Sequence, residues 1–220
     1  MNLTFGKEIK SCLVIDSLKL AEKLCIDLDD KDAKAEWNDL VEAAYEIASP
    51  KATIRKIDVS ILNDEEVMFG KEKMHSKILT NKLKKSQAVY AYVATCGKEL
   101  DEWSDGITDP LLAYYADTIK IDIVSFAAQF LRKYIKDKVQ GFTGVISPGS
   151  TKDWPVDQQK QLFDAIEDVE GKIGVVLTPS SLMIPTKSVS SVIFITSEEH
   201  EDCEFCDMEN CPTRRVPFNN

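Results

Sequence analysis

A single run of apolar residues at helical spacing constrains this chain more than any other feature. Between positions 112 and 134 an apolar side chain recurs every three or four residues, which places all of them on one face of a helix. Asp109 can cap the start of this helix with Pro110 in its first position, and Gly141 follows its end near Val139. At 1.5 Å per residue the helix is about 45 Å long, so we expect it to be the central helix of the core. Its apolar face consists of Leu112, Tyr115, Ile119, Ile123, Phe126, Phe130 and Tyr134.

The rest of the chain alternates strand patterns with shorter helical patterns. Branched and aromatic residues predict strands at residues 53–62, 88–95, 172–178 and 189–196. Helices are predicted at residues 35–48, at the lysine-rich residues 67–83 and at 155–166, and residues 142–154 indicate a turn-rich stretch. Because strands and helices of unequal length do not form a regular βαβ repeat, we predict an α+β fold with a mixed or antiparallel sheet around the long helix. Residues 1–196 are expected to form one domain and residues 197–220 an acidic, cysteine-rich tail.

Charge and hydropathy exclude several classes of partner. The net charge of −10 is unsuited to a nucleic-acid-binding protein, which needs a basic face to neutralise phosphates. No segment approaches the roughly 20 apolar residues of a membrane span, and residues 1–10 carry charges where a signal peptide is apolar. We therefore expect a cytoplasmic protein whose six cysteines are reduced, and which serve as ligands or as packed thiols rather than in disulfides.

The chain lacks the motifs of common enzymes and offers two small-residue loops instead. It has no glycine-rich phosphate loop, no His-Glu-x-x-His and no Gly-x-Ser-x-Gly. Residues 147–150 and 178–190 are rich in serine, threonine and proline, which form tight turns that can expose hydroxyl and backbone N–H groups to a ligand. Such loops can equally be plain connections between elements. The candidate binding residues are Ser147, Pro148, Gly149, Ser150, Thr178, Ser180, Ser188 and Ser190.

The C-terminal cysteines form the second candidate site. Cys203, Cys206 and Cys211 are spaced closely enough to bind one zinc ion or an iron–sulfur cluster, with His200 or Cys96 as the fourth ligand. Seven carboxylates between positions 198 and 209 disfavour thiolates, so unliganded thiols in an acidic tail are the alternative.

Two ordered segments carry a resemblance to a known family. The sequence Leu177-Thr178-Pro179-Ser180-Ser181-Leu182-Met183-Ile184-Pro185, followed by Ser188-Val189-Ser190, is similar to the Leu-Thr-x-Ser-x-x-Met-x-Pro-x-x-Ser-Val-Ser stretch of the activation domain of cobalamin-dependent methionine synthase. As in that family, it follows a Pro-Gly loop and a short helix. The helix end Tyr134-Ile135-Lys136-Asp137-Lys138-Val139 resembles the family's Tyr-Leu-x-Glu-Arg-Val. The similarity covers residues 88–196, about half of the chain.

The resemblance implies a role in cobalamin chemistry. Activation domains bind S-adenosylmethionine and dock on the cobalamin domain when cobalt has been oxidised to cob(II); one-electron reduction and methylation then restore methylcobalamin. By this resemblance the chain is a stand-alone accessory protein for a cobalamin-dependent methyltransferase or corrinoid protein that holds the cobalamin. Its enzymatic contribution, if it has one, is a share of methionine synthase activity, in methionine biosynthesis, and the electron comes from a separate donor or from a cluster in the tail.

Two departures from the family pattern lie in the S-adenosylmethionine loop and a third lies in the long helix. Val145 and Ser150 stand where the family's Arg-x-x-Pro-Gly-Tyr motif has its arginine and tyrosine, and Gln129 aligns with a family glutamate. Loss of the charge-assisted contact between arginine and a carboxylate costs about 1.5–3 kcal/mol, which predicts weak binding of S-adenosylmethionine. Two other functions fit parts of the sequence: a metal- or iron–sulfur-bearing redox protein that does not bind S-adenosylmethionine, and an S-adenosylmethionine-binding methyltransferase subunit.

Overall fold

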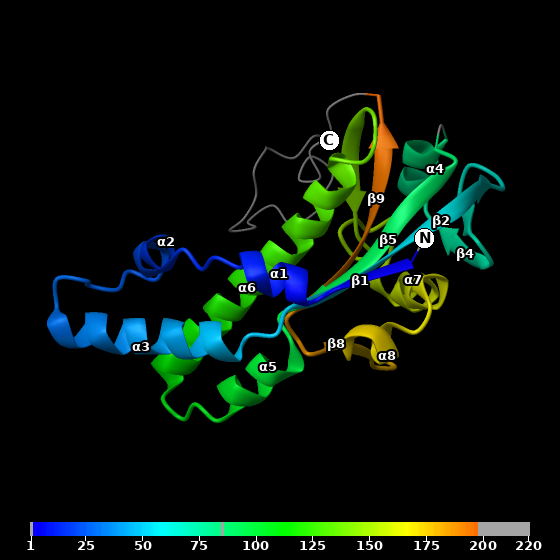
Figure 1. The fold of residues 1–220 in the computed structure, drawn as a ribbon. Helices are drawn as coiled ribbons and strands as arrows, with labels where there is room; N and C mark the ends of the chain where they lie inside the picture. The colour runs from blue at the N-terminus through cyan, green and yellow to red at the C-terminus, as the bar shows by residue number, and fades with distance from the viewer. Residues whose placement is uncertain (1, 85, 198–220) are drawn as a thin grey trace.

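An antiparallel sheet of seven strands forms the centre of the molecule, which is described by a computed structural model over residues 2–84 and 86–197 (Figure 1). The strand order is β4-β3-β2-β5-β9-β6, and β1 also pairs with β2. Two further short strands pair only with each other. The sheet strands are β1 (Asn2–Phe5), β2 (Lys51–Ile61), β3 (Glu66–Phe69), β4 (Glu72–His75), β5 (Ala88–Thr95), β6 (Phe142–Ile146) and β9 (Ser188–Thr196), and the separate hairpin is β7 (Val176–Leu177) with β8 (Met183–Ile184).

Helices cover both faces of this sheet, and the longest runs along one of them (Figure 1). That helix, α6, begins after Asp109, whose carboxylate accepts hydrogen bonds from the amides of Leu111 and Leu112, as its sequence predicts. The helices are α1 (Lys7–Cys12), α2 (Ser17–Lys23), α3 (Lys31–Ile47), α4 (Lys77–Leu83), α5 (Lys98–Asp105), α6 (Pro110–Lys136), α7 (Gln159–Ile166) and α8 (Val169–Ile173), with a 3-10 turn at Val156–Gln158.

The alternation of side chains along the strands divides the core in two. On one face Val89 and Val93 of β5 belong to an apolar cluster that includes residues of α4, α7 and α8. On the other face Tyr92 and Ala94 pack in a cluster with residues of α6. Successive residues of a strand point to opposite faces, so one strand serves both clusters.

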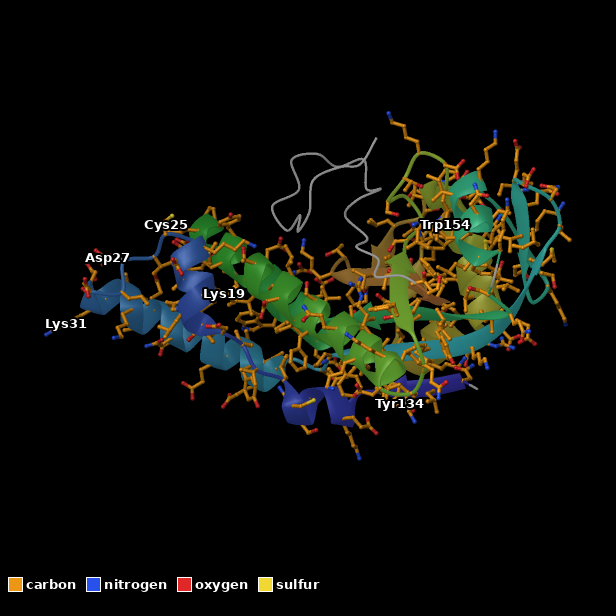
Figure 2. All side chains as sticks on the ribbon, turned by 90° about the horizontal axis from the view of Figure 1, so that it is seen from above. Lys19, Cys25, Asp27, Lys31, Tyr134 and Trp154 are labelled. Carbon is orange, nitrogen blue, oxygen red and sulfur yellow. The ribbon has the colours of Figure 1, made fainter. Side chains whose placement is uncertain are left out.

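A third apolar cluster forms a helical lobe beyond the end of the sheet. Here α2, α3 and α5 pack on the N-terminal half of α6, with Trp37 of α3 edge-on to Tyr115 of α6 at 5.9 Å between ring centroids. Figure 2 shows Lys31, at the start of α3, and Trp154, on the far side of the sheet, at opposite ends of the molecule. The helix α6 joins the lobe to the sheet, since it contributes to the lobe cluster and to the cluster on one sheet face.

The α+β class, the antiparallel sheet and the long helix are therefore confirmed. Three local predictions are wrong. The lysine-rich helix at 67–83 is a β3–β4 hairpin followed by α4, because Gly70 adopts φ +59° and turns the chain. The strand at 172–178 is replaced by the end of α8, closed by Gly174 in the left-handed conformation, and by the two-residue β7. The turn-rich stretch at 142–154 begins with the edge strand β6.

No helix in residues 2–84 and 86–197 combines the length and the apolar character that a membrane crossing requires.

Candidate functional site

The predicted loop at residues 147–150 is a tight turn at the end of β6. The Ser150 hydroxyl donates to the Ser147 carbonyl at 2.7 Å and thereby closes the turn. Gly149 adopts φ +80°, and its amide donates to the Trp154 carbonyl at 2.7 Å. A Cβ at Gly149 would lie 3.2 Å from Val156, so both conformation and space favour glycine there. Pro148 is buried, whereas Gly149 is exposed and both serines are partly accessible.

This turn lies directly beside β9. The last paired residues of the two strands are Ile146 and Val192, and one step further the hydroxyls of Ser147 and Ser191 are 2.7 Å apart. The 147–150 turn therefore lies beside β9, one residue beyond the predicted 178–190 segment, and a site shared by the two loops stays a prediction. Ser191 was not among the predicted residues. Because successive strand residues point to opposite faces, its position after Ser190 places it on the face opposite to that of Ser190.

The serines of β9 are divided between the two faces of the sheet, and the two predicted ones lie on the same face. Ser191 lies opposite Tyr92, on the face covered by α6, whereas Ser190 lies opposite Val93 on the other face. Ser188 shares the face of Ser190, and its hydroxyl donates to the Pro185 carbonyl at 2.7 Å. Both Ser188 and Ser190 are buried. Hence Ser188 holds the end of the loop before β9, and the hydroxyl partner of Ser147 is Ser191.

The α6 face adds two groups that the sequence pattern did not single out. Arg132 of α6 donates from Nε to the Tyr92 hydroxyl at 3.4 Å, and Tyr92 lies opposite Ser191 in the sheet. Val145 is buried in the apolar cluster of this face, next to Ile193. The position where the family has an arginine is thus part of the apolar core, while α6 brings a guanidinium to the same face of the sheet.

The loop at 178–182 forms the turn of the β7–β8 hairpin. The hydroxyls of Thr178 and Ser180 are 3.1 Å apart, and Thr178 Oγ1 accepts from the Leu182 amide at 3.0 Å. The hairpin exposes an apolar patch consisting of Val176, Leu182 and Ile184, which are 40, 52 and 48% exposed. Since Met183 packs against the core from the same hairpin, the patch is held on a fixed base.

A charged network attaches the segment before β9 to the helices. Lys120 of α6 is buried and donates to Asp101 at 2.9 Å and to Ser104 at 2.7 Å, both in α5. The other Asp101 oxygen accepts from the Thr186 amide at 3.3 Å, and Lys187 forms an ion pair with Asp117 of α6 at 2.9 Å. This network fixes the position of the chain between the exposed hairpin and the buried serines.

Cys96 lies beneath this network as a packed thiol. It is fully buried in the lobe cluster, and burial is the main cause that raises its pKa to about 12. A neutral, enclosed thiol is a poor metal ligand, so the structure does not favour Cys96 as the fourth ligand of a tail site. The predicted ligands His200, Cys203, Cys206 and Cys211 lie outside the described residues, and their zinc or iron–sulfur site stays a prediction. Within residues 2–84 and 86–197, no group of three His, Cys, Asp or Glu side chains is arranged to hold a metal ion.

Comparison with solved structures identifies the fold. The crystal structure of the MetH reactivation domain bound to AdoHcy superposes with a TM-score of 0.60, over 91% of this chain and 79% of that one. This chain has the fold of the MetH reactivation domain. Sequence identity over the match is only 14%. No protein-family model and no curated protein matches the sequence. The resemblance seen in the serine-rich segment therefore extends to the architecture of nearly the whole chain.

Proposed function

We propose that this protein docks on a cobalamin-binding methyltransferase or corrinoid protein and supports the reductive reactivation of its cobalt. The observation that carries the proposal is the combination of a reactivation-domain fold with a Ser-Pro-Gly turn that meets the serine-rich β9 segment at one end of the sheet. The chain shares the overall fold of the MetH reactivation domain and has two segments that resemble the activation-domain family in sequence.

The docking surface is the apolar hairpin patch together with the 147–150 turn. Exposed apolar side chains on a rigid base are typical of surfaces that bind another protein. Val176 and Ile184 form a cross-strand pair, so their side chains lie on the same side of the hairpin. Leu182 extends this surface at the turn.

S-adenosylmethionine is the proposed methyl donor, bound weakly. Val145 supplies no charge, and its side chain is enclosed in the core. Arg132 is the cation that α6 brings to this face, and it holds the Tyr92 hydroxyl. We expect a dissociation constant at least about tenfold weaker than that of a domain with the family arginine, measured by calorimetry on both proteins. Equal affinities of the two proteins for S-adenosylmethionine would show that valine at position 145 does not weaken binding.

The test is reactivation of a corrinoid protein that has no activation domain of its own. The partner is prepared with cob(II)alamin and given S-adenosylmethionine and a chemical reductant, and methylcobalamin formation is followed by its absorbance spectrum. We expect the added chain to accelerate methylation and Leu182→Asp to abolish the acceleration. Leu62→Asp is the matched control, because Leu62 and Leu182 are 51 and 52% exposed. No acceleration by the wild-type chain, or equal effects of the two substitutions, would contradict the proposal.

A further inference from the structure

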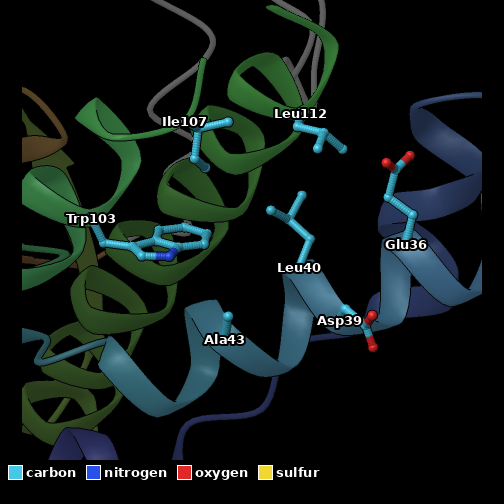
Figure 3. Close-up of a pocket in the computed structure, with 7 residues that line it drawn as sticks. All are labelled: Glu36, Asp39, Leu40, Ala43, Trp103, Ile107 and Leu112. Carbon is cyan, nitrogen blue, oxygen red and sulfur yellow. The ribbon is translucent and has the colours of Figure 1, made fainter. Parts of the chain in front are cut away.

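A groove in the helical lobe, apart from the sheet end where the serine segments meet, has the properties of a second docking surface. It has a volume of about 530 Å³ and is lined by residues of α3, α5 and the start of α6 and by the turn between the last two helices. Figure 3 shows Trp103, Ile107, Leu112 and Leu40 around its apolar interior, with Glu36 and Asp39 on the α3 side. Glu36 and Asp39 are three residues apart in one helix, so their carboxylates lie on the same face.

The two helices α3 and α5 that border the groove are strongly acidic. Residues 27–47 and 98–109, which build α3 and α5 with their caps, contain thirteen Asp and Glu residues and three lysines. Their formal charge of −10 equals that of the whole 220-residue chain, because the acidic and basic residues in the rest of the sequence are equal in number. Among the described residues the negative charge is therefore concentrated on the lobe, where it attracts cations and repels acidic partners.

Trp103 supplies a large, partly exposed apolar side chain to the lining of the groove. The indole packs on the lobe cluster and remains partly accessible, unlike Trp37 and Trp154, which are 2% and 0% exposed. A tryptophan that lines an apolar depression with charged groups at its edge is typical of the residues that dominate the energy of many interfaces. Its ring face can also attract a lysine or arginine side chain.

We propose that this groove binds a basic amphipathic helix of a partner protein. One apolar side chain of that helix occupies the depression between Trp103 and Leu40, and its lysine or arginine residues face Glu36 and Asp39. The charge of the walls selects a basic segment over an acidic one. The seven lining residues belong to helices or to a helix–helix turn, so the groove offers side chains rather than a strand edge for pairing. The proposal is independent of corrinoid docking, which uses the hairpin patch.

The test uses an 18-residue synthetic helix of leucine and lysine as the probe, and its leucine–glutamate counterpart as the control peptide. The protein is labelled with 5-fluorotryptophan, which gives one fluorine resonance for each of Trp37, Trp103 and Trp154. We expect the basic peptide to shift the Trp103 resonance saturably at low salt and to leave the other two unchanged. The acidic peptide should shift none of them.

Two pairs of variants separate the groove from general attraction between opposite charges. Glu36→Gln with Asp39→Asn should weaken peptide binding at least about fivefold, because both carboxylates are lost from the groove. Asp157→Asn with Asp164→Asn removes the same charge from exposed positions in and next to α7, on the other side of the sheet, and should change affinity less than about twofold. Ala43→Arg, which fills the groove and retains Trp103, should weaken binding more than about tenfold without altering the circular dichroism spectrum.

Several results would overturn the proposal. These are a Trp103 resonance that does not move, equal losses in the two charge pairs, or equal binding of the acidic peptide. A Trp103 resonance that shifts with protein concentration alone, together with dimer formation in analytical ultracentrifugation, would assign the groove to a second copy of the chain instead. None of these results depends on cobalamin or on S-adenosylmethionine.

Discussion

Replacement of Lys120 by methionine tests the buried network that attaches the segment before β9. The substitution keeps the length and most of the apolar volume of the side chain, and removes the ammonium that Asp101 and Ser104 accept from. Removing one member of a buried pair typically costs 3–5 kcal/mol. The Asp101 side chain is 18% exposed and keeps the Thr186 amide, so water can partly replace the lysine. We therefore expect a loss of about 2–3 kcal/mol, or about 5–10 °C in Tm for a chain of this size.

Urea unfolding followed by circular dichroism measures this loss. Lys98→Met is the control, because the Lys98 ion pair with Glu102 is largely exposed and should contribute less than about 0.5 kcal/mol. The double variant Lys120→Met with Asp101→Asn should lose at least about 1 kcal/mol less than the sum of the single losses, since the two groups share one interaction. A Lys120→Met loss below about 1 kcal/mol, or additive losses, would refute this account of the network.

Three further predictions concern single side chains. Cys96, whose pKa is raised to about 12 by burial, should resist iodoacetamide at pH 8 in the folded chain and react in urea. The exposed Cys12 and Cys25 should react under both conditions. Mass spectrometry of the peptides measures the labelling, and rapid labelling of Cys96 in the folded chain would contradict the prediction. Burial raises the pKa of Asp122, so its charged form destabilises the folded chain above that pKa. Asp122→Asn should therefore raise Tm at pH 7, and the gain should vanish below about pH 3, where the carboxyl is protonated in both states; an equal gain at both pH values would exclude a charge effect. Gly97→Ala should cost at least about 2 kcal/mol in urea unfolding, because φ is +103° and the new Cβ would lie 2.5 Å from the Ser49 carbonyl oxygen; a loss below 1 kcal/mol would mean that the turn relaxes.

The sequence is most informative where one local rule acts without competition. The apolar face, the Asp109 cap and Pro110 all indicate the same helix, and α6 forms there. The runs at β5 and β9 are apolar and branched, as suits central strands buried on both faces. At residues 67–83, by contrast, the spacing of the lysines indicates a helix whereas Gly70 favours a turn. Pairing of β3 with β2 stabilises the hairpin that forms there. A short edge strand such as β6 has too few residues for its pattern to stand out.

The candidate site was predictable only as two segments. The motifs of both segments are local in the sequence, and they occur in the same order along the chain as in the family that they resemble. The contact between Ser147 and Ser191 depends on the register of β6 against β9, which no local pattern contains. The same holds for Arg132 and Tyr92, which are 40 residues apart. The groove in the lobe joins residues of α3 with residues near Trp103, and it arises from helix packing alone.

Dependence of binding on the oxidation state of cobalt tests the central claim most directly. A docking protein that acts selectively on the inactive state should bind that state more tightly than the methylated state, because a ligand with equal affinity for two states shifts no equilibrium between them. The affinity of the immobilised chain is to be measured for one corrinoid protein prepared as cob(II)alamin and as methylcobalamin. We predict at least about tenfold tighter binding of the cob(II) form, a difference of about 1.4 kcal/mol that Leu182→Asp removes and Leu62→Asp retains. Equal affinity for the two forms, or no binding to either, would contradict the claim.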